Sequence, residues 1–144
     1  GGPCAVLLTD PEGVILDLYT TLDSRARRAL NLYPGFSCHE RFCGTNGWGT
    51  PLVAGRAMCV VGAENYAWSA KEWACAGSPI AGPDGRPVGG LSIGVPFPSF
   101  ESALFTLLIS CVGTIERCLR ARLLDSRVAL GEEAGGDARD GGVS

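Results

Sequence analysis

The sequence predicts an α+β fold, in which helices gather on one face of a central antiparallel sheet. Two observations lead to this prediction. Apolar segments of strand length are joined in pairs by short turn sequences at residues 10–13 and 82–85, which is the pattern of β-hairpins. Apolar residues then recur at three- and four-residue spacing after residue 100, which is typical of a helix that packs on a sheet.

The composition is that of one globular domain. Of the 144 residues, 46% are hydrophobic and 19% are charged, which is enough apolar material for a single core. The net charge of −3 comes from the acidic tail at residues 131–144, so the preceding chain has no excess charge to attract DNA or an anionic membrane. Because we find neither a signal pattern nor an apolar run of membrane-spanning length, we expect a cytoplasmic protein without direct nucleic-acid or membrane contacts.

The first elements are predicted to be a hairpin and a short helix. Residues 4–19 contain two apolar runs around the sequence Asp-Pro-Glu-Gly, in which proline presets the turn and Gly13 supplies a positive φ. Asp23 or Ser24 can then cap a short helix, whose arginines lie on the solvent side and which stops before a Pro-Gly pair.

The next segment, residues 36–55, is rich in glycine and small polar residues, so we expect a loop with one short helix. Thr45 or Thr50 can cap this helix, and Thr50 is favoured because Pro51 would then stand at the first helical position, where its missing N–H costs nothing. Gly55 is expected to end the helix.

A strand, helical turns and a second hairpin follow. Residues 57–62 are a compact β-branched run between glycines, which predicts a buried strand, and residues 63–73 can form one or two helical turns. In the second arm of the next hairpin, bulky apolar residues alternate with glycine and serine between residues 90 and 95. One face of that strand is therefore filled, and the other has room for a closely packed helix or for a ligand.

The C-terminal helix is expected to span about residues 100–124, with Ser99 as its cap. Its apolar stripe comprises Phe105, Leu108, Val112, Ile115 and Leu119. At about 1.5 Å per residue the helix is longer than a sheet crossing requires, so its last turns should project towards a partner helix or a following domain. Leu108, Val112 and Ile115 are candidates for pairing with a second copy across a two-fold axis. We expect a domain of residues 1–125 and a flexible linker or tail at residues 126–144.

The glycine-rich sequence GTNGWGT, residues 44–50, is not a phosphate-binding loop. A P-loop requires a lysine within its motif, and Lys71 is the only lysine in the chain. The G-x-G-x-x-G fingerprint of dinucleotide-binding folds is also absent here. His39 is the only histidine and no serine has an evident base partner, so a Ser-His-Asp site is not supported.

Aromatic residues gather in the irregular segments around this sequence. They are Phe42, Trp48, Tyr66, Trp68 and Trp73. Above a sheet face of glycine and serine, such rings would suit an apolar or flat ligand. They would equally well cap the hydrophobic core, and the composition leaves both interpretations open.

The seven cysteines include no C-x-x-C pair, and a chain without a secretory signal is not expected to be a disulfide scaffold. Cys38, His39, Cys43 and Cys75 have a spacing that matches no common zinc finger. Cys38 and Cys43 lie in a loop beside His39 and Arg41, which can lower a thiol pKa. A redox pair is therefore an alternative to inert cysteines.

Several motifs together resemble a known sensor family. They are GTNGWGT, GAENY, the W-x-C of EWACAG and the hairpin turn GPDGRP, in the family's order and spacing. They are similar to the GAF sensor domain at the N-terminus of sigma-54-dependent transcriptional activators of the acetoin catabolism regulator type, over residues 4–125. The resemblance implies a GAF-like antiparallel sheet of about six strands, with helices on one face and ligand loops on the other. It also implies a small-molecule or protein-signal input site, dimerisation through terminal helices, and downstream ATPase and DNA-binding domains in a parent protein.

Three positions depart from the family pattern. Asn65 stands where a histidine is common, Pro51 stands where an alanine is usual, and residues 91–93 lack an aspartate that is common in the last strand. Because these positions lie in or near the presumed pocket, the identity of the effector does not follow from the acetoin regulator.

We therefore expect a non-enzymatic sensory domain that binds a small-molecule effector, signals through a dimerisation helix at residues 100–124, and uses no cofactor or metal. The ligand-binding residues that we assign are Cys43, Asn46, Trp48, Glu64, Tyr66, Trp68, Trp73 and Cys75. The alternatives are a cysteine-based redox sensor at Cys38 and Cys43, an enzyme similar to free methionine sulfoxide reductase, and a ligand-free dimerisation scaffold.

Overall fold

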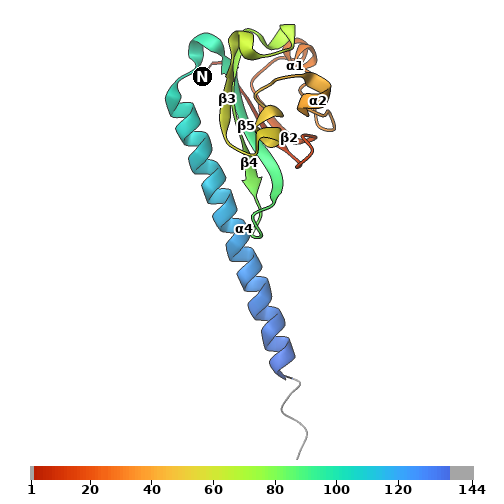
Figure 1. Ribbon diagram of the computed structural model, residues 1–144, viewed down its shortest axis with the longest axis vertical. Helices are drawn as coiled ribbons and strands as arrows, with labels where there is room; N and C mark the ends of the chain where they lie inside the picture. The colour runs from red at the N-terminus through yellow and green to blue at the C-terminus, as the bar shows by residue number, and fades with distance from the viewer. Residues whose placement is uncertain (1, 137–144) are drawn as a thin grey trace, which may run out of the picture.

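A computed structural model of the chain describes residues 2–136. A five-stranded antiparallel sheet, in the order β2-β1-β5-β4-β3, stands between a layer of loops with short helices and one long helix (Figure 1). The strands are β1 (Ala5–Thr9), β2 (Ile15–Thr20), β3 (Met58–Val61), β4 (Trp73–Ala81) and β5 (Pro87–Pro96). The predicted α+β class is confirmed, and the sheet of the described residues has one strand fewer than the approximate six that the resemblance implied.

Four α-helices and three 3₁₀ turns complete the described part of the chain. The helices are α1 (Ser24–Ala29), α2 (Glu40–Cys43), α3 (Thr50–Ala54) and α4 (Ser102–Gly136). The turns are η1 (Gly62–Glu64), η2 (Trp68–Ala70) and η3 (Phe97–Ser99). Because η3 takes up the residues before Phe100, α4 begins at Ser102 rather than at residue 100. The helix also extends past residue 124, and residues 137–144 of the expected linker lie outside the described part.

The two predicted hairpins are confirmed. In the first turn, the carboxylate of Asp10 accepts hydrogen bonds of 2.9 Å from the backbone N–H groups of Glu12 and Val14, and Gly13 has a φ of 82°. Gly85 has a φ of 81° in the second turn. Asp23 caps α1 as expected, because its side chain accepts a 2.8 Å hydrogen bond from the N–H of Ala26.

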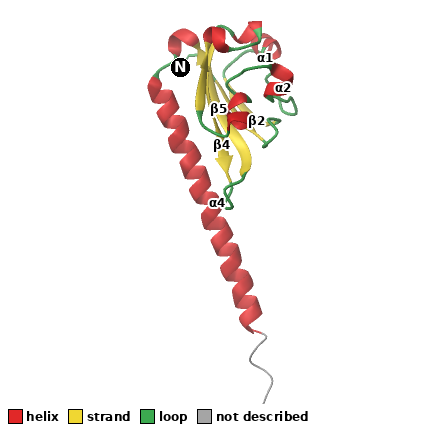
Figure 2. Cartoon of the chain, viewed as in Figure 1, coloured by secondary structure: helices red, strands yellow, loops and turns green. Residues whose placement is uncertain are grey.

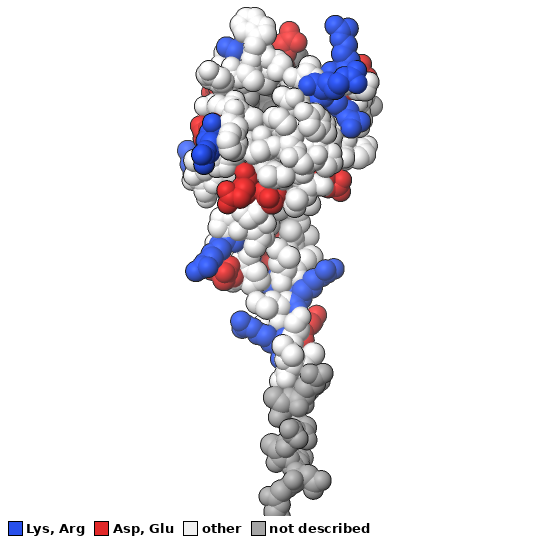
Figure 3. Space-filling model, turned by 90° about the vertical axis from the view of Figure 1, so that its right-hand side faces the viewer, with Lys and Arg blue, Asp and Glu red and all other residues white. Residues whose placement is uncertain are grey.

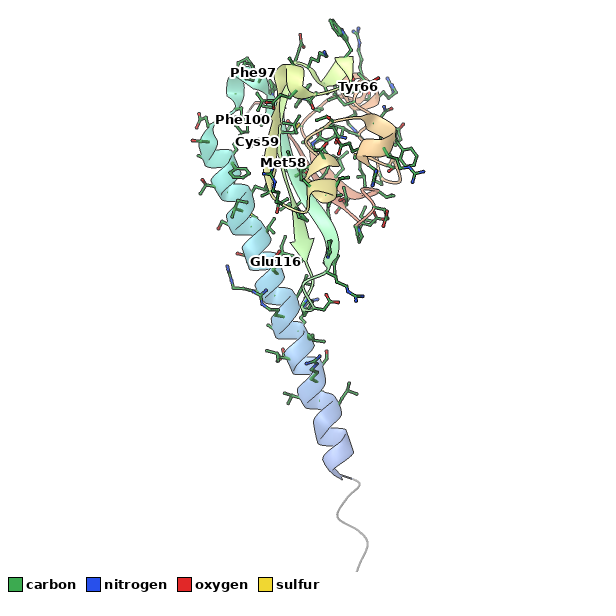
Figure 4. The ribbon with its side chains drawn as sticks, in the orientation of Figure 1. Met58, Cys59, Tyr66, Phe97, Phe100 and Glu116 are labelled. Atoms are coloured by element: carbon green, nitrogen blue, oxygen red, sulfur yellow. The ribbon has the colours of Figure 1, made fainter. Side chains whose placement is uncertain are left out.

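The sheet has one buried face towards α4 and another towards the loop layer (Figure 2). The α4 side contains the buried residues Ala76, Ile80, Leu108 and Val112, with Cys59, Leu91, Ile93, Phe100, Phe105, Ile115 and Leu119 packed around them. Figure 4 shows Cys59 and Phe100 between β3 and the start of α4. The loop side contains Ala5, Leu7, Ile15, Leu30, Leu32, Cys38, Trp48, Ala70 and Cys75. The loops lie opposite α4, as expected, and the short helices α1, α2 and α3 lie with the loops rather than beside α4.

The small-residue side of β4 and β5 is filled by the chain itself. A Cβ built on Gly90 would lie 2.8 Å from Cδ2 of Leu52, and one on Gly94 would lie 3.5 Å from the indole nitrogen of Trp48. The room that the sequence left open at these positions is therefore occupied by α3 and the loop before it. Glycine is needed there because a larger residue would separate the two layers.

One prediction about α4 is wrong. Leu108 is only 3% exposed and Val112 is buried with it against β4 and β5, so these residues cannot pair with a second copy. A further contact holds α4 to the sheet, since Oε1 of Glu116 accepts a 2.9 Å hydrogen bond from the backbone N–H of Ala81 at the end of β4 (Figure 4). By length and composition, residues Ser102–Gly131 are also long and apolar enough to cross a membrane, although one face of this helix packs on the sheet.

Substitution of Gly77 tests how tightly the loop layer packs on β4. A Cβ there would lie 2.8 Å from Cγ of Pro51 and 3.0 Å from Oγ of Ser92, and closer still to the carbonyl oxygen of Gly47. We expect Gly77→Ala to lower the free energy of unfolding by about 1–3 kcal/mol, as overpacking of a core does. The measurement is urea unfolding followed by circular dichroism.

The control for this prediction is Gly113→Ala. A Cβ on Gly113 would meet only the flexible end of Arg117, at 3.4 Å, and alanine favours the helix. Its unfolding midpoint should stay equal or rise. Equal midpoints for Gly77→Ala and the parent chain would contradict close packing between the loop layer and β4.

Candidate functional site

The loop before α3 is held by the side chain of Asn46, which is buried. Its Oδ1 accepts hydrogen bonds from the backbone N–H groups of Trp48 (3.0 Å) and Gly49 (2.7 Å). Its Nδ2 donates to the carbonyl oxygens of Cys38 (3.0 Å) and Gly44 (2.9 Å). These four bonds use both donors and both lone pairs of the carboxamide, so Asn46 has nothing left to offer a ligand.

Asn46 also explains why Thr50 does not cap α3. The Thr50 hydroxyl accepts a 3.0 Å hydrogen bond from the backbone N–H of Asn46, which precedes the helix, and Thr50 itself is the first helical residue. The predicted end of the helix is confirmed, because Gly55 adopts the left-handed conformation with a φ of 69°.

Trp48 lies with its ring against the sheet and is only 7% exposed. Its ring lies next to Gly94 of β5. A Cβ built on Gly94 would be 3.5 Å from the indole nitrogen of Trp48 and 3.1 Å from Sγ of Cys75. The indole Nε1 is buried and has no hydrogen-bond partner among the described residues. Trp48 therefore contacts the sheet through the apolar surface of its ring and not through a hydrogen bond.

Above Trp48 is a small, partly open hollow. It is lined by Leu30, Asn31, Phe36, Cys38, Cys43, Asn46, Trp48, Ala67, Ser69 and Ala70. These residues come from the end of α1, the loops around α2, and η2, and none of them carries a charge. Figure 3 shows charged side chains at the margins of one face of the domain and an uncharged centre. An apolar, concave site of this kind suits a small uncharged molecule.

Asn31 and Ser69 are the polar lining side chains that the sequence analysis missed. Asn31 is the only non-glycine residue with a positive φ (54°) in the described chain, and its Oδ1 accepts a 3.3 Å hydrogen bond from the hydroxyl of Tyr33. Within the described residues, Nδ2 of Asn31 and the hydroxyl of Ser69 make no side-chain hydrogen bond. The signal in the sequence was the asparagine shortly before Pro-Gly, since asparagine tolerates the left-handed conformation.

Three of the eight assigned ligand residues line the hollow, namely Cys43, Asn46 and Trp48. Two others, Cys75 and Trp73, belong to the core below it: Cys75 is buried, and Trp73 is half-buried and packs on the same cluster.

The remaining three residues lie outside the hollow. Trp68 is 84% exposed, and the ammonium group of Lys71 lies over its ring. Tyr66 is 76% exposed and points outwards (Figure 4). The carboxylate of Glu64 accepts a 2.7 Å hydrogen bond from the N–H of Val61 and so supports η1. The aromatic rings were near in sequence, but the turns of η1 and η2 direct two of them into solvent.

The loop cysteines are held in the thiol form. Burial, and then the proximity of Cys43, raises the pKa of Cys38 to about 12, and burial is the main cause that raises the pKa of Cys75 to about 12. Burial also raises the pKa of Cys43, whose thiol donates a 3.2 Å hydrogen bond to the carbonyl of Ser37. Because the thiolate is the reactive form, this environment disfavours redox or nucleophilic chemistry at these residues.

Comparison with known proteins shows which family the chain belongs to. Residues 2–117 match the family model described as the MimR N-terminal domain. The chain belongs to this family. It is 35% identical over 130 residues to the propane 2-monooxygenase operon transcriptional activators MimR of Mycolicibacterium smegmatis and Mycolicibacterium goodii. The match covers 88% of this chain and 22% of each relative, so the chain spans about a fifth of the length of these activators.

A solved structure supports the fold. The chain superposes on the N-terminal part of Escherichia coli DhaR, crystallised in complex with DhaL, with a TM-score of 0.85 over 94% of this chain and 47% of that one. At 18% sequence identity this likeness shows the GAF-like fold alone. The predicted resemblance to N-terminal sensor domains of transcriptional activators is confirmed, and the relatives of the family are activators rather than enzymes.

Substitution of Asn46 tests its role in the loop. We expect Asn46→Ala to lower the free energy of unfolding by about 2–4 kcal/mol, because it leaves several buried backbone groups without partners. Asn46→Asp keeps the two acceptor contacts but places a carboxylate oxygen against the carbonyl oxygens of Cys38 (3.0 Å) and Gly44 (2.9 Å) at a buried position, so at neutral pH it should cost at least as much as the alanine variant. Urea unfolding measures both. An alanine variant as stable as the parent would show that the loop does not depend on this side chain.

The raised thiol pKa values predict a loss of stability in alkali. The unfolded thiols lose their protons near the ordinary pKa of 9.0, whereas those of Cys38 and Cys75 keep them up to about 12 in the folded chain. Their contribution is therefore fully present below about pH 9 and is lost as the pH rises from about 9 to about 12. We expect the free energy of unfolding to fall over this window, and to fall less steeply in the double variant Cys38→Ala/Cys75→Ala. Equal slopes would contradict the prediction.

Proposed function

We propose that this domain is the non-enzymatic sensory input of a transcriptional activator and that a small uncharged effector binds in the hollow above Trp48. The observation that carries the proposal is the hollow itself, whose lining is apolar and free of charged side chains. Membership of an activator family supports a regulatory role. The raised thiol pKa values argue against the alternative of a redox sensor at Cys38 and Cys43.

The lining also favours a chemical class of effector. An ionised molecule would lose its hydration in the hollow without gaining a counter-charge, which is costly. The amide of Asn31 and the hydroxyl of Ser69 suit at most a molecule with one small polar group. The relatives are activators of a propane 2-monooxygenase operon, and a three-carbon hydrocarbon or its hydroxylated product has this chemistry.

We further propose that the domain works as a homodimer through α4 in a cytoplasmic parent protein. That protein would carry the ATPase and DNA-binding domains, so this chain makes no direct contact with nucleic acid and lies on no membrane. The sheet connects the hollow to α4, because Trp48 packs on the loop side of β4 and β5 and Leu108 packs on their other side. An effector would act by favouring one of two arrangements of α4.

The test is binding of small molecules to the purified domain. We expect propane and 2-propanol, but not propionate, to shift the NMR signal of the Trp48 indole N–H. Ala70 is buried and lines the hollow, so Ala70→Leu should fill it and weaken binding by about tenfold or more. Trp68→Ala is the matched control, because Trp68 lies outside the hollow and its loss should leave the affinity unchanged.

Two outcomes would contradict this proposal. If Ala70→Leu bound the same molecules as tightly as the parent, the effector site would lie elsewhere. If no member of a wider series of uncharged molecules bound the parent chain, the domain would be a ligand-free scaffold.

A further inference from the structure

Three exposed aromatic rings lie beside the hollow without lining it. Phe42 is 70% exposed, Tyr66 is 76% exposed and Trp68 is 84% exposed. Each of them is the chain neighbour of a lining residue, because Phe42 precedes Cys43 and Ala67 lies between the other two. We call these three residues the aromatic rim. Several large exposed rings in one place are typical of a surface that another molecule covers.

The packing of the chain brings these rings together. A Cβ built on Gly44 would overlap the ring of Tyr66, so this ring lies directly on the residue that ends α2. The backbone N–H of Tyr66 also donates a 2.9 Å hydrogen bond to the carbonyl oxygen of Thr45. Phe42 belongs to α2, and Trp68 follows Tyr66 by two residues. The aromatic rim is therefore one surface, although its two segments are far apart in the chain.

The aromatic rim also shares a wall with the hollow. Beside it is a second, open depression, which is lined by Trp68, Ser69, Lys71 and Glu72. Ser69 belongs to η2 and lines both the hollow and this depression. A molecule that covers the aromatic rim would therefore rest on the outer side of the turn that closes the hollow.

A cation accompanies two of the three rings. The guanidinium carbon of Arg41 lies 5.3 Å from the centre of the Phe42 ring, and the ammonium nitrogen of Lys71 lies 5.4 Å from that of Trp68. Neither cation forms an ion pair within the described part of the chain. A cation placed over a ring keeps N–H donors that can meet a carboxylate from another molecule.

The segments around the aromatic rim carry a small excess of positive charge. Residues 23–43 and 65–72 contain four arginines and one lysine against three carboxylates. This excess attracts an acidic partner. Because the carboxylates are interspersed among the cations, the surface suits a protein of mixed charge better than a nucleic acid, which carries a negative charge at every phosphate.

We propose that the aromatic rim docks an acidic segment of another protein, in which an apolar side chain is flanked by carboxylates. The apolar side chain would pack on Trp68 and Tyr66, and the carboxylates would pair with Lys71 and Arg41. Tryptophan, tyrosine and arginine are the residue types that most often dominate the binding energy of protein interfaces. The inference does not depend on an effector, although the docked protein would share η2 with the effector site of the proposed function.

Selection from a library of short random peptides, with the purified chain as bait, tests this surface. We expect the selected peptides to combine Asp or Glu with a large apolar residue. Their affinity should fall by about tenfold or more for Trp68→Ala and for the charge reversal Lys71→Glu. Tyr19→Ala serves as the control, because Tyr19 is a ring on β2 that is 68% exposed and lies outside the aromatic rim. It should leave the affinity unchanged, and all three variants should keep the unfolding midpoint of the parent chain.

Three outcomes would overturn the inference. Peptides that bind Trp68→Ala and Lys71→Glu as tightly as the parent would show that docking occurs elsewhere. A selection that enriches no peptide would show that the aromatic rim is not a docking surface. A single-stranded oligonucleotide whose binding depends on Trp68 would assign the surface to nucleic acid instead. Since peptide binding is measured without an effector, none of these results bears on the proposed effector site, and a failure of effector binding leaves the aromatic rim standing.

Discussion

The side chain of Asn46 is the contact on which the loop layer depends. The chain between α2 and α3 is irregular, and one carboxamide satisfies the N–H groups of Trp48 and Gly49 together with the carbonyl groups of Cys38 and Gly44. Because these groups belong to Trp48 itself and to residues on both sides of it, the same contacts position the indole against the sheet. A neutral amide does this without charge, so the wall of the hollow that it supports stays apolar.

The central strands β4 and β5 are packed on both faces, by the loop layer on one side and by α4 on the other. On the loop side, glycines let Trp48 and Pro51 approach the backbone. On the other side, Ile93 and its neighbours pack on α4, and Glu116 ties that helix to the end of β4. Since packed interiors transmit small displacements rather than absorb them, a change at Trp48 has a short route to α4. Figure 1 shows that α4 continues well beyond the sheet.

Burial distinguishes the roles of chemically similar residues in this domain. Cys38 and Cys75 are enclosed by apolar groups and retain their protons, whereas Cys111 and Cys118 lie on the open face of α4. Trp48 is buried against glycine, whereas Trp68 is exposed. Helix α4 is itself divided in this way, because the stripe through Leu108 is covered by the sheet and the stripe through Leu107 is not.

Local rules in the sequence determined the α+β class, both hairpins, the Asp23 cap and the Gly55 stop. These features depend on turn chemistry, capping and residue periodicity, which act over a few residues. Tertiary structure decided which aromatic rings reach the hollow, that Asn46 is a saturated structural contact, and which stripe of α4 meets the sheet. Those outcomes depend on groups far apart in the chain: Trp48 is placed by Gly94, and Leu108 by Ala76 and Ile80. Spacing along one segment carries no information about which distant segment will cover it.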